Sequence, residues 1–333
     1  MRDVASAASV SVKTVSRVVH NYPFISDDVR GRVQAEIRRL GFRPNSNAVG
    51  LRRTDRPAGG IGVLAADLAD PFYAGMLSAI EQVCTARSFT TLVAGSDEDP
   101  ARERGLLGTF VERRLDGLIV VSADRRHDHL RPELAVGTRM VFADRPPRRL
   151  PVDCVLAAHA EGAGQAVAHL LGQGHRTIAY VGHSPVIHTA RERLRGFRAA
   201  LAQAGLEPHA VRTDAVDTAA AHRAAAELLA ADDAPTALFA DNPRLVGGVA
   251  RAIAESGAPR TALVGFDDSE LAQVLGVTVV AQDPRELGRR AAELLFTRLD
   301  GDRSRPRRVV LPTTLVPRGS GEGLGVALRS LGR

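Results

Sequence analysis

Short β-branched runs alternate with longer stretches rich in alanine, leucine and arginine from residue 61 onward. Eight of these runs are apolar almost throughout, as buried parallel strands are: IGVLAAD, TTLVAG, DGLIVVS, MVFAD, TIAYVGH, TALFAD, TALVGF and TVVAQ. Helices are predicted between them, among others over 161–172, 193–204, 218–230, 244–256 and 284–299. This alternation predicts doubly wound α/β layers, in which helices cover both faces of a parallel sheet.

Polar residues follow the carboxyl ends of these predicted strands, in the segments DLADPFY, RERLRGF, FADN, GFDD and AQDP. Ligands of doubly wound sheets bind beyond this edge. Acids, amides and arginines make strong hydrogen bonds to hydroxyl groups, and an aromatic ring offers a flat face to a sugar or a base. The pattern therefore predicts a site for a polyhydroxylated ligand. His183 and His188, in the segment GHSPVIH, either line this site or lie in a surface loop.

The excess positive charge of the chain lies entirely in its first 57 residues. Lys13, the only lysine, and ten arginines stand there against five acids, whereas the rest of the chain has equal numbers of bases and acids. A small basic module on a neutral body is typical of a nucleic-acid binder. A basic surface that faces only solvent would have the same composition.

Two short helices are predicted at the start of this module, RDVASAA and a second that begins near Val12 and that Ser11 caps. The second helix has an apolar stripe and an opposite polar side, namely Val15, Val18 and Val19 against Lys13, Ser16, Arg17 and His20. Two short helices joined by a tight turn, the second polar on its outer side, indicate a helix-turn-helix.

A third helix is predicted after Ser26, which stands in a capping position, and it ends at Gly41. Its acids lie in the first turn and its basic residues in the last, where each sign suits the helix dipole. An apolar stripe follows the helical repeat: Val29, Val33, Ile37 and Leu40. Three helices in so short a segment give a marginal core.

Residues 3–53 resemble the DNA-binding headpiece of the lactose-repressor (LacI/GalR) family, most clearly in the runs VSVKTVSRVV and LGFRPN. The resemblance implies that the second helix enters the major groove of DNA. The implied contacts of that helix are Val12, Lys13, Thr14, Ser16, Arg17 and His20. Lysine and arginine can pair with guanine or with phosphate, and the sequence leaves both open.

The segment NSNAVGLRR is too short and too rich in polar residues and glycine to be a stable helix alone. The family resemblance implies a hinge helix that forms on operator DNA, with Asn45, Ala48 and Leu51 as contacts. Leu51 holds the place of a leucine that wedges between base pairs in the minor groove.

Two features depart from the family pattern. Ser9 stands in the turn where the family has glycine, so a left-handed backbone there would cost about 1 kcal/mol. The first helix begins directly after Met1 without a capping residue, so either translation starts a few codons further upstream or this helix frays.

From residue 61 to about 318 the body resembles the effector domain of the same family, a two-lobed periplasmic-binding-protein type I fold. The resemblance places the effector contacts at the strand ends, in the motifs DPF, R-x-x-GF and GFDD and at two further strand ends. The implied contacts are Asp70, Phe72, Tyr73, Arg193, Asp241, Asp267 and Gln282.

The predicted fold is thus an N-terminal all-α helix-turn-helix headpiece with a hinge helix, followed by a two-lobed α/β domain with two doubly wound parallel sheets. Its predicted parts are a headpiece over 1–44, a hinge helix and linker over 45–58, and an effector domain over 59–333. The first lobe is expected to take 59–157 and 284–309, and the second lobe 158–283 and 310–333.

The resemblance implies a homodimeric transcription regulator, in most members a repressor, that binds palindromic operator DNA and a small effector such as a sugar, polyol or nucleoside. Motifs of metalloproteases, phosphate-binding loops, serine hydrolases and dinucleotide-binding enzymes do not occur, so no enzymatic activity and no cofactor is expected.

No apolar run reaches the ~20 residues of a membrane helix, and the N-terminus carries no secretory signal. Cys84 and Cys154 match no metal spacing and are expected to be buried. A cytoplasmic protein is predicted. The main alternative is a solute-binding, receptor-like protein with a weakened DNA-binding head.

Overall fold

The computed structural model describes residues 1–19, 22, 24–40, 59–257 and 260–322. The chain divides into two compact units, Met1–Ala58 and Gly59–Arg333. No helix of the described residues is long and apolar enough to cross a membrane. The predicted hinge over 45–58 and the predicted DNA contacts His20, Asn45, Ala48 and Leu51 lie outside the described residues.

Three helices form the described part of the first unit: α1 (Arg2–Ala7), α2 (Val12–Val19) and α3 (Asp27–Arg39). Their core is a small apolar cluster, made of Val4, Ala5, Ala8, Val15, Val18 and Val33. The predicted stripe of α2 therefore faces this core. The order of the helices and the buried valines confirm the helix-turn-helix.

The turns of this unit follow the predictions only in part. Ser11 Oγ accepts from the Thr14 backbone N–H at 3.0 Å and so caps α2. Ser9 adopts the predicted left-handed backbone, with φ 52°. Ser26 stands at the N-cap position of α3, but its side chain makes no capping hydrogen bond, since the exposed first turn leaves its N–H groups to solvent. Leu40 was predicted to belong to the apolar stripe of this helix. It lies past the end of α3 and is 41% exposed, so that prediction is wrong.

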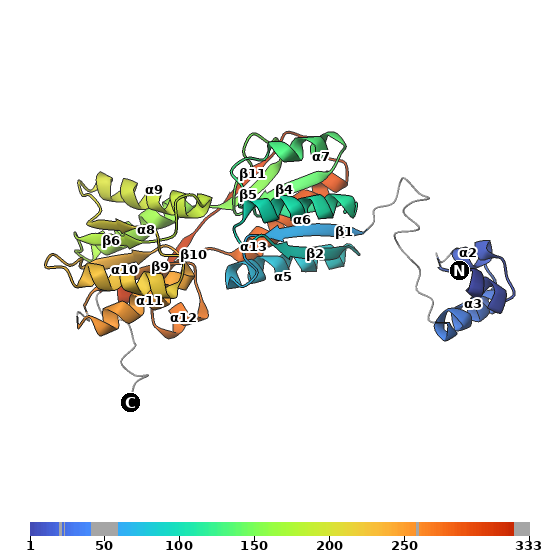
Figure 1. The fold of residues 1–333 in the computed structure, drawn as a ribbon, viewed down its shortest axis with the longest axis horizontal. Coiled ribbons are helices and arrows are strands. Elements are labelled where there is room, and N and C mark those ends of the chain that lie inside the picture. The colour runs from blue at the N-terminus through green and yellow to red at the C-terminus, as the bar shows by residue number, and fades with distance from the viewer. Residues whose placement is uncertain (20–21, 23, 41–58, 258–259, 323–333) are drawn as a thin grey trace, which may run out of the picture. The chain divides into compact units, whose positions relative to one another are not determined.

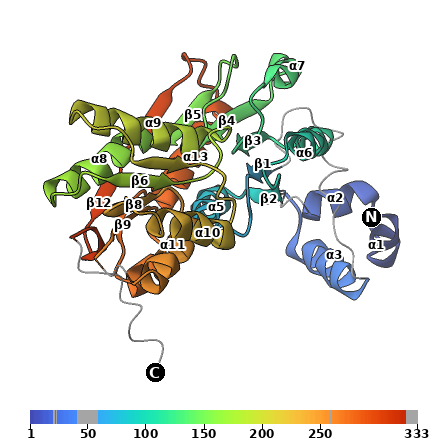
Figure 2. The ribbon, with the colours of Figure 1, turned by 60° about the vertical axis from the view of Figure 1, so that its left-hand side comes forward.

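Six parallel strands form the sheet of the first lobe, in the order β11-β5-β4-β3-β1-β2. The strands are β1 (Gly60–Ala65), β2 (Thr90–Gly95), β3 (Gly117–Val120), β4 (Arg139–Ala143), β5 (Asp153–Ala157) and β11 (Arg308–Leu311). The helices are α5 (Pro71–Ala86), α6 (Pro100–Glu112), η1 (Asp128–Leu130), α7 (Arg131–Ala135) and α13 (Pro284–Leu299). Helices α5 and α13 pack side by side (Figures 1 and 2). Val63 and Leu64, neighbours in β1, are both fully buried in clusters on opposite faces of the sheet.

The second lobe repeats this plan with the order β12-β10-β9-β8-β6-β7. Its strands are β6 (Ile178–Val181), β7 (Ala210–Arg212), β8 (Ala237–Ala240), β9 (Ala262–Phe266), β10 (Thr278–Ala281) and β12 (Thr314–Val316). Its helices are α8 (His159–Gly172), α9 (His188–Gln203), α10 (Thr218–Leu229), α11 (Pro243–Glu255), α12 (Glu270–Val274) and η2 (Ser320–Glu322). The pairs α8–α9 and α10–α11 pack closely over separate apolar clusters.

The chain passes between the lobes three times, after β5, after β10 and after β11 (Figure 1). Strand β12 pairs antiparallel with β10, unlike the predicted parallel arrangement. The reason is that the chain leaves β11 at the edge facing the second lobe, so the next strand must run away from that edge. Residues 310 and 311 were predicted to belong to the second lobe, but β11 places them in the sheet of the first.

Candidate ligand cleft and nucleic-acid interface

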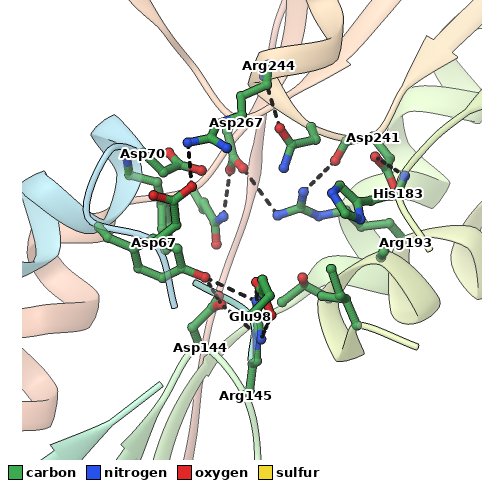
Figure 3. Close-up of a pocket in the computed structure, with 17 residues that line it drawn as sticks. Asp67, Asp70, Glu98, Asp144, Arg145, His183, Arg193, Asp241, Arg244 and Asp267 are labelled. Carbon is green, nitrogen blue, oxygen red and sulfur yellow. Dashed lines mark hydrogen bonds and ion pairs between the residues drawn. The ribbon is translucent and has the colours of Figure 1, made fainter. Parts of the chain in front are cut away.

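A cleft of about 660 Å³, partly open to solvent, is lined by residues of both lobes (Figure 3). All seven effector residues predicted from the sequence line it: Asp70, Phe72, Tyr73, Arg193, Asp241, Asp267 and Gln282. His183, for which the sequence allows either a place in the site or a surface loop, also lines the cleft. Seven further polar lining residues were not predicted: Asp67, Glu98, Asp144, Arg145, Thr189, Asn242 and Arg244.

Arg193 organises the wall that the second lobe contributes. A Cβ at Gly196, one turn further along α9, would lie 2.0 Å from the carbonyl oxygen of Ala160, so glycine allows α9 to lie close against α8. The buried Arg193 guanidinium donates to the carbonyl oxygen of Asp241 and, at 3.2 Å, to Asp267 Oδ2. It also lies 3.9 Å from the centroid of the Phe266 ring. The arginine thus ties together the ends of two strands.

Two aspartates of this wall are held as oriented acceptors. Asp267 follows β9 with φ 68°, and its side chain accepts from Gln282 Nε2 at 2.6 Å. Asp241 follows β8 and accepts from the Tyr180 hydroxyl at 2.6 Å and from the His183 backbone N–H at 3.1 Å. Burial raises the pKa of Asp267, and it raises the pKa of Asp241 to about 6.

The first lobe presents an equivalent aspartate. Asp144 follows β4 with φ 64°, and its backbone N–H donates to the next strand, as that of Asp267 does in the second lobe. Its Oδ2 accepts from the Tyr73 hydroxyl at 3.2 Å. Burial alone would raise the pKa of Asp144, but His159 and the Arg145 and Arg193 guanidinium groups outweigh it and hold that pKa at about 2.

Buried Arg145 pairs with the half-buried Glu98 beside Asp144. Arg145 Nη1 donates to Glu98 Oε2 at 2.7 Å and to the Ser122 carbonyl oxygen at 3.0 Å. Glu98 reaches this position from the loop after β2, where its backbone is left-handed with φ 60°. The positive charge of Arg145 is therefore neutralised within the protein.

His159 connects the two walls, although it does not itself line the cleft. It is the first residue of α8, directly after a passage between the lobes. Its Nδ1 accepts from Arg193 Nε at 3.3 Å, and its Nε2 lies 3.6 Å from Asp144 Oδ1. Burial lowers the pKa of His159, which favours the neutral ring that such an acceptor requires.

An ion pair between Arg244 of α11 and Asp67, which follows β1, also joins the lobes. Close to it, Asp70 caps α5 by accepting from the Phe72 backbone N–H at 2.9 Å. Asp70 therefore serves as a helix cap and also lines the cleft. Burial raises the pKa of its carboxyl group.

The cleft is rich in hydrogen-bond acceptors. Its lining includes six carboxylates but only three guanidinium groups, and each of these three pairs with a carboxylate of the same cleft. Hydroxyl groups that donate to carboxylates suit such a lining. Among the described residues no group of three or more His, Cys, Asp or Glu side chains could hold a metal ion. Cys84 and Cys154 are buried thiols, as predicted.

Helix α2 presents the candidate nucleic-acid interface. Lys13 and Arg17 are exposed, Val12 is 43% exposed, and Thr14 and Ser16 are half-buried. The valines of the opposite side are buried in the core of the unit. This helix therefore turns a cationic, hydrogen-bonding surface outward, as its sequence predicted.

The fold and the two sites define a class of protein, in which a helix-turn-helix headpiece precedes a two-lobed ligand-binding domain. Residues 1–45 match the model of "Bacterial regulatory proteins, lacI family", and residues 167–321 match "Periplasmic binding protein-like domain". The ribose operon repressor of Haemophilus influenzae is 30% identical over 327 residues, which cover 96% of this chain and 98% of that protein. The chain belongs to the LacI family of bacterial transcription regulators.

Other relatives agree. The transcriptional regulator DegA of Bacillus subtilis is 30% identical over 330 residues, which cover 96% of this chain and 96% of that protein. Among solved structures, the lac repressor dimer bound to operator and the anti-inducer ONPF superposes with a TM-score of 0.84 at 26% identity, covering 96% of this chain and 98% of that chain. A complex of the transcriptional regulator CelR with cellobiose superposes with a TM-score of 0.71 at 28% identity, again covering 96% and 98%.

Proposed function

We propose that this protein is a repressor that binds palindromic operator DNA as a homodimer and responds to a sugar or related polyol in the cleft. The observation that carries this proposal is the cleft itself, which is lined by both lobes and supplies oriented carboxylates at the strand ends. A ligand that donates hydroxyl hydrogens to Asp241, Asp267 and Asp144 would contact both lobes at once.

The DNA half of the proposal rests on α2. Lys13 and Arg17, both exposed, would contact base edges or phosphates, together with Val12, Thr14 and Ser16 of the same helix. Two half-sites of a palindrome need two headpieces, which is why we propose a dimer. His20 and the hinge residues Asn45, Ala48 and Leu51 remain part of the proposed interface on the strength of the family resemblance.

Ligand and DNA would be coupled through the relative orientation of the lobes. A ligand held by both walls favours one orientation, and that orientation would set the spacing of the two hinges in the dimer. The coupling free energy of such systems is typically about 1–3 kcal/mol. We propose binding without chemical transformation of the ligand, and a cytoplasmic location, where operator DNA is found.

Two experiments test this proposal. Selection of DNA from a random pool by the full-length protein should return a palindrome, and failure to enrich any sequence would favour the alternative of a receptor-like protein with a weakened head. A thermal-shift screen against monosaccharides, disaccharides, polyols and nucleosides should give one class of hits, since a ligand at about 100 times its Kd adds about 2.7 kcal/mol.

The screen also allows a residue-level test. Asp267→Ala should weaken binding of the best hit about tenfold, equivalent to about 1.4 kcal/mol, because the hydrogen-bonded carboxylate is lost. The matched control is Asp268→Ala, whose carboxylate pairs with Arg318 and does not line the cleft. Equal affinities of wild type and Asp267→Ala, measured by calorimetry, would remove Asp267 from the site.

A further inference from the structure

A second hollow borders the cleft. It spans about 380 Å³, a volume that includes open solvent, and it shares Arg145 and Ile187 with the lining of the cleft. The loops after β3 and β4 form its wall in the first lobe, and the segment leading into α9 forms its wall in the second. Apart from these two residues, the lining of the hollow is separate from that of the cleft.

Three arginines surround this hollow, which we call the arginine pocket: Arg125 and Arg148 of the first lobe and Arg191 of the second. Within the described part of the chain, no carboxylate pairs with any of the three guanidinium groups. Burial lowers the pKa of Arg191, the charges of Arg148 and Arg125 lower it further, and Glu192 has the opposite, smaller effect, so Arg191 lies within electrostatic reach of the other two arginines. Like charges gathered around a hollow repel, and a bound anion would remove that cost.

The other polar residues of the arginine pocket do not cancel its charge. Asp124 is the one acid in its lining, and its Oδ2 already accepts from Arg104 Nη2 at 2.7 Å and Nε at 2.9 Å. His127 Nδ1 accepts from the Arg148 backbone N–H at 2.8 Å, and this hydrogen bond holds the backbone of Arg148 in place. His188 Nδ1 lies 2.9 Å from Arg191 Nη2. The pocket therefore keeps a net positive lining beside an acid-rich cleft.

From this juxtaposition we infer that the arginine pocket binds the anionic group of the effector, so that the effector is a sugar or polyol bearing a phosphate or a carboxylate. The inference rests on the proposed function of the cleft and narrows its ligand class. Hydroxyl groups would donate to the carboxylates of the cleft, and the anion would accept from Arg125, Arg148 and Arg191. Arg145, which lines both the cleft and the arginine pocket, does not offer a second anion site because Glu98 already neutralises its charge.

The position of the arginine pocket gives the anion a role in lobe orientation. Arg191 comes from the second lobe, whereas Arg125 and Arg148 come from the first. Without an anion the two sides repel each other, and a bound anion would attract both. The anionic group would therefore favour the orientation in which the lobes are close at this edge.

The test uses inorganic phosphate and two pairs of sugars on the full-length protein, by thermal shift and calorimetry at constant ionic strength. The sugar pairs are glucose with glucose 6-phosphate and glucose with glucuronate, which separate phosphate from carboxylate. We expect inorganic phosphate to stabilise the wild type at millimolar concentration and one of the anionic sugars to bind more tightly than glucose. In the double variant Arg125→Gln/Arg148→Gln, affinity for phosphate should fall at least about tenfold.

The control is Arg126→Gln, which removes an exposed arginine next to Arg125 that does not line the pocket, and it should bind phosphate as the wild type does. Melting temperatures measured without phosphate distinguish a misfolded variant from one that has lost only the anion site. In that measurement the double variant should be at least as stable as the wild type, because repulsion between the arginines is relieved. An equal phosphate response in wild type and double variant, or none in the wild type, overturns the inference. Tight binding of neutral sugars alone would also overturn it, while leaving the proposed function intact.

Discussion

The headpiece and the effector domain build their sites in opposite ways. The proposed DNA contacts that the structure describes lie within the eight residues of α2, which packs on a core of six small apolar side chains. The effector site draws its residues from Asp67 to Gln282, across both lobes, and most of its charged groups are buried. The first site is therefore local and exposed, whereas the second depends on tertiary packing and on neutralised charges.

This difference teaches where function and stability are separable. In the described part of the headpiece no charged side chain is buried, so the DNA surface can change with little effect on its core. In the effector domain the groups that would bind a ligand also hold the strand ends together, as Arg193 does with Asp241 and Asp267. Substitutions there should affect binding and stability together.

The largest expected effect is on DNA binding. Replacing Lys13 and Arg17 by Ala should cost about 2–6 kcal/mol of preference for the selected operator, since each good base contact contributes about 1–3 kcal/mol. Ligand affinity should stay unchanged because both residues belong to the other unit. Arg38→Ala/Arg39→Ala removes the same charge at the end of α3 and should retain operator preference. A parallel loss of ligand affinity would contradict the separation of the two units.

The second effect concerns pH and the buried Asp241. Because its folded pKa is raised from 3.8 to about 6, its contribution to stability is complete below about pH 4 and is lost as pH rises through 6. Over that range the loss is at most about 3 kcal/mol. Relative to the wild type, Asp241→Asn should therefore gain up to this amount between about pH 4 and pH 7.

The comparison with Asp241→Asn is necessary because buried histidines act in the opposite direction. The pKa of His159 is lowered by burial, so it opposes folding at acid pH in both proteins. Urea denaturation of the effector domain across this range measures the difference directly. A difference that does not change with pH would mean that Asp241 is not titrating there.

A matched pair of core substitutions compares the two units directly. Val15 of α2 and Val63 of β1 are both fully buried, and Val→Ala should cost about 2 kcal/mol at each. The headpiece has a small core, so Val15→Ala should unfold a large part of it and abolish operator binding. Val63→Ala should only lower the melting temperature of the effector domain by a few degrees. Retained operator binding in Val15→Ala would show that the headpiece is more stable than its core suggests.

The smallest effect is expected at Ser9. Its left-handed backbone, with φ 52°, should become less strained in Ser9→Gly, which stabilises the headpiece by up to about 1 kcal/mol. Amide hydrogen exchange of α1 and α2 measures this gain, and slightly tighter operator binding should accompany it. Faster exchange in the variant would mean that the serine side chain contributes more than the backbone strain costs.

Local patterns in the sequence were sufficient for much of this structure. The apolar stripe of α2, the Ser11 cap and the positive φ of Ser9 follow from neighbours within a few residues. Most of the strands and the polar residues at their ends were also predictable, because buried parallel strands are continuous apolar runs and their carboxyl ends meet at one edge. Four strands were not predicted. Strands β7, β11 and β12 are short, partly exposed edge strands, and β5 is buried but has only five residues, the first of them Asp153.

The sequence by itself thus determined the division into two units, most of their helices and strands, and seven lining residues of the cleft. Tertiary structure alone decided which charges meet: Glu98 with Arg145, Arg244 with Asp67, and His159 between Asp144 and Arg193. It also decided the antiparallel direction of β12 and the gathering of Arg125, Arg148 and Arg191. The physical reason is that the spacing of apolar residues along the chain and the nearest neighbours of a residue fix its local conformation and burial. The partner of a charged side chain, in contrast, depends on chain segments that become adjacent only when both lobes have folded.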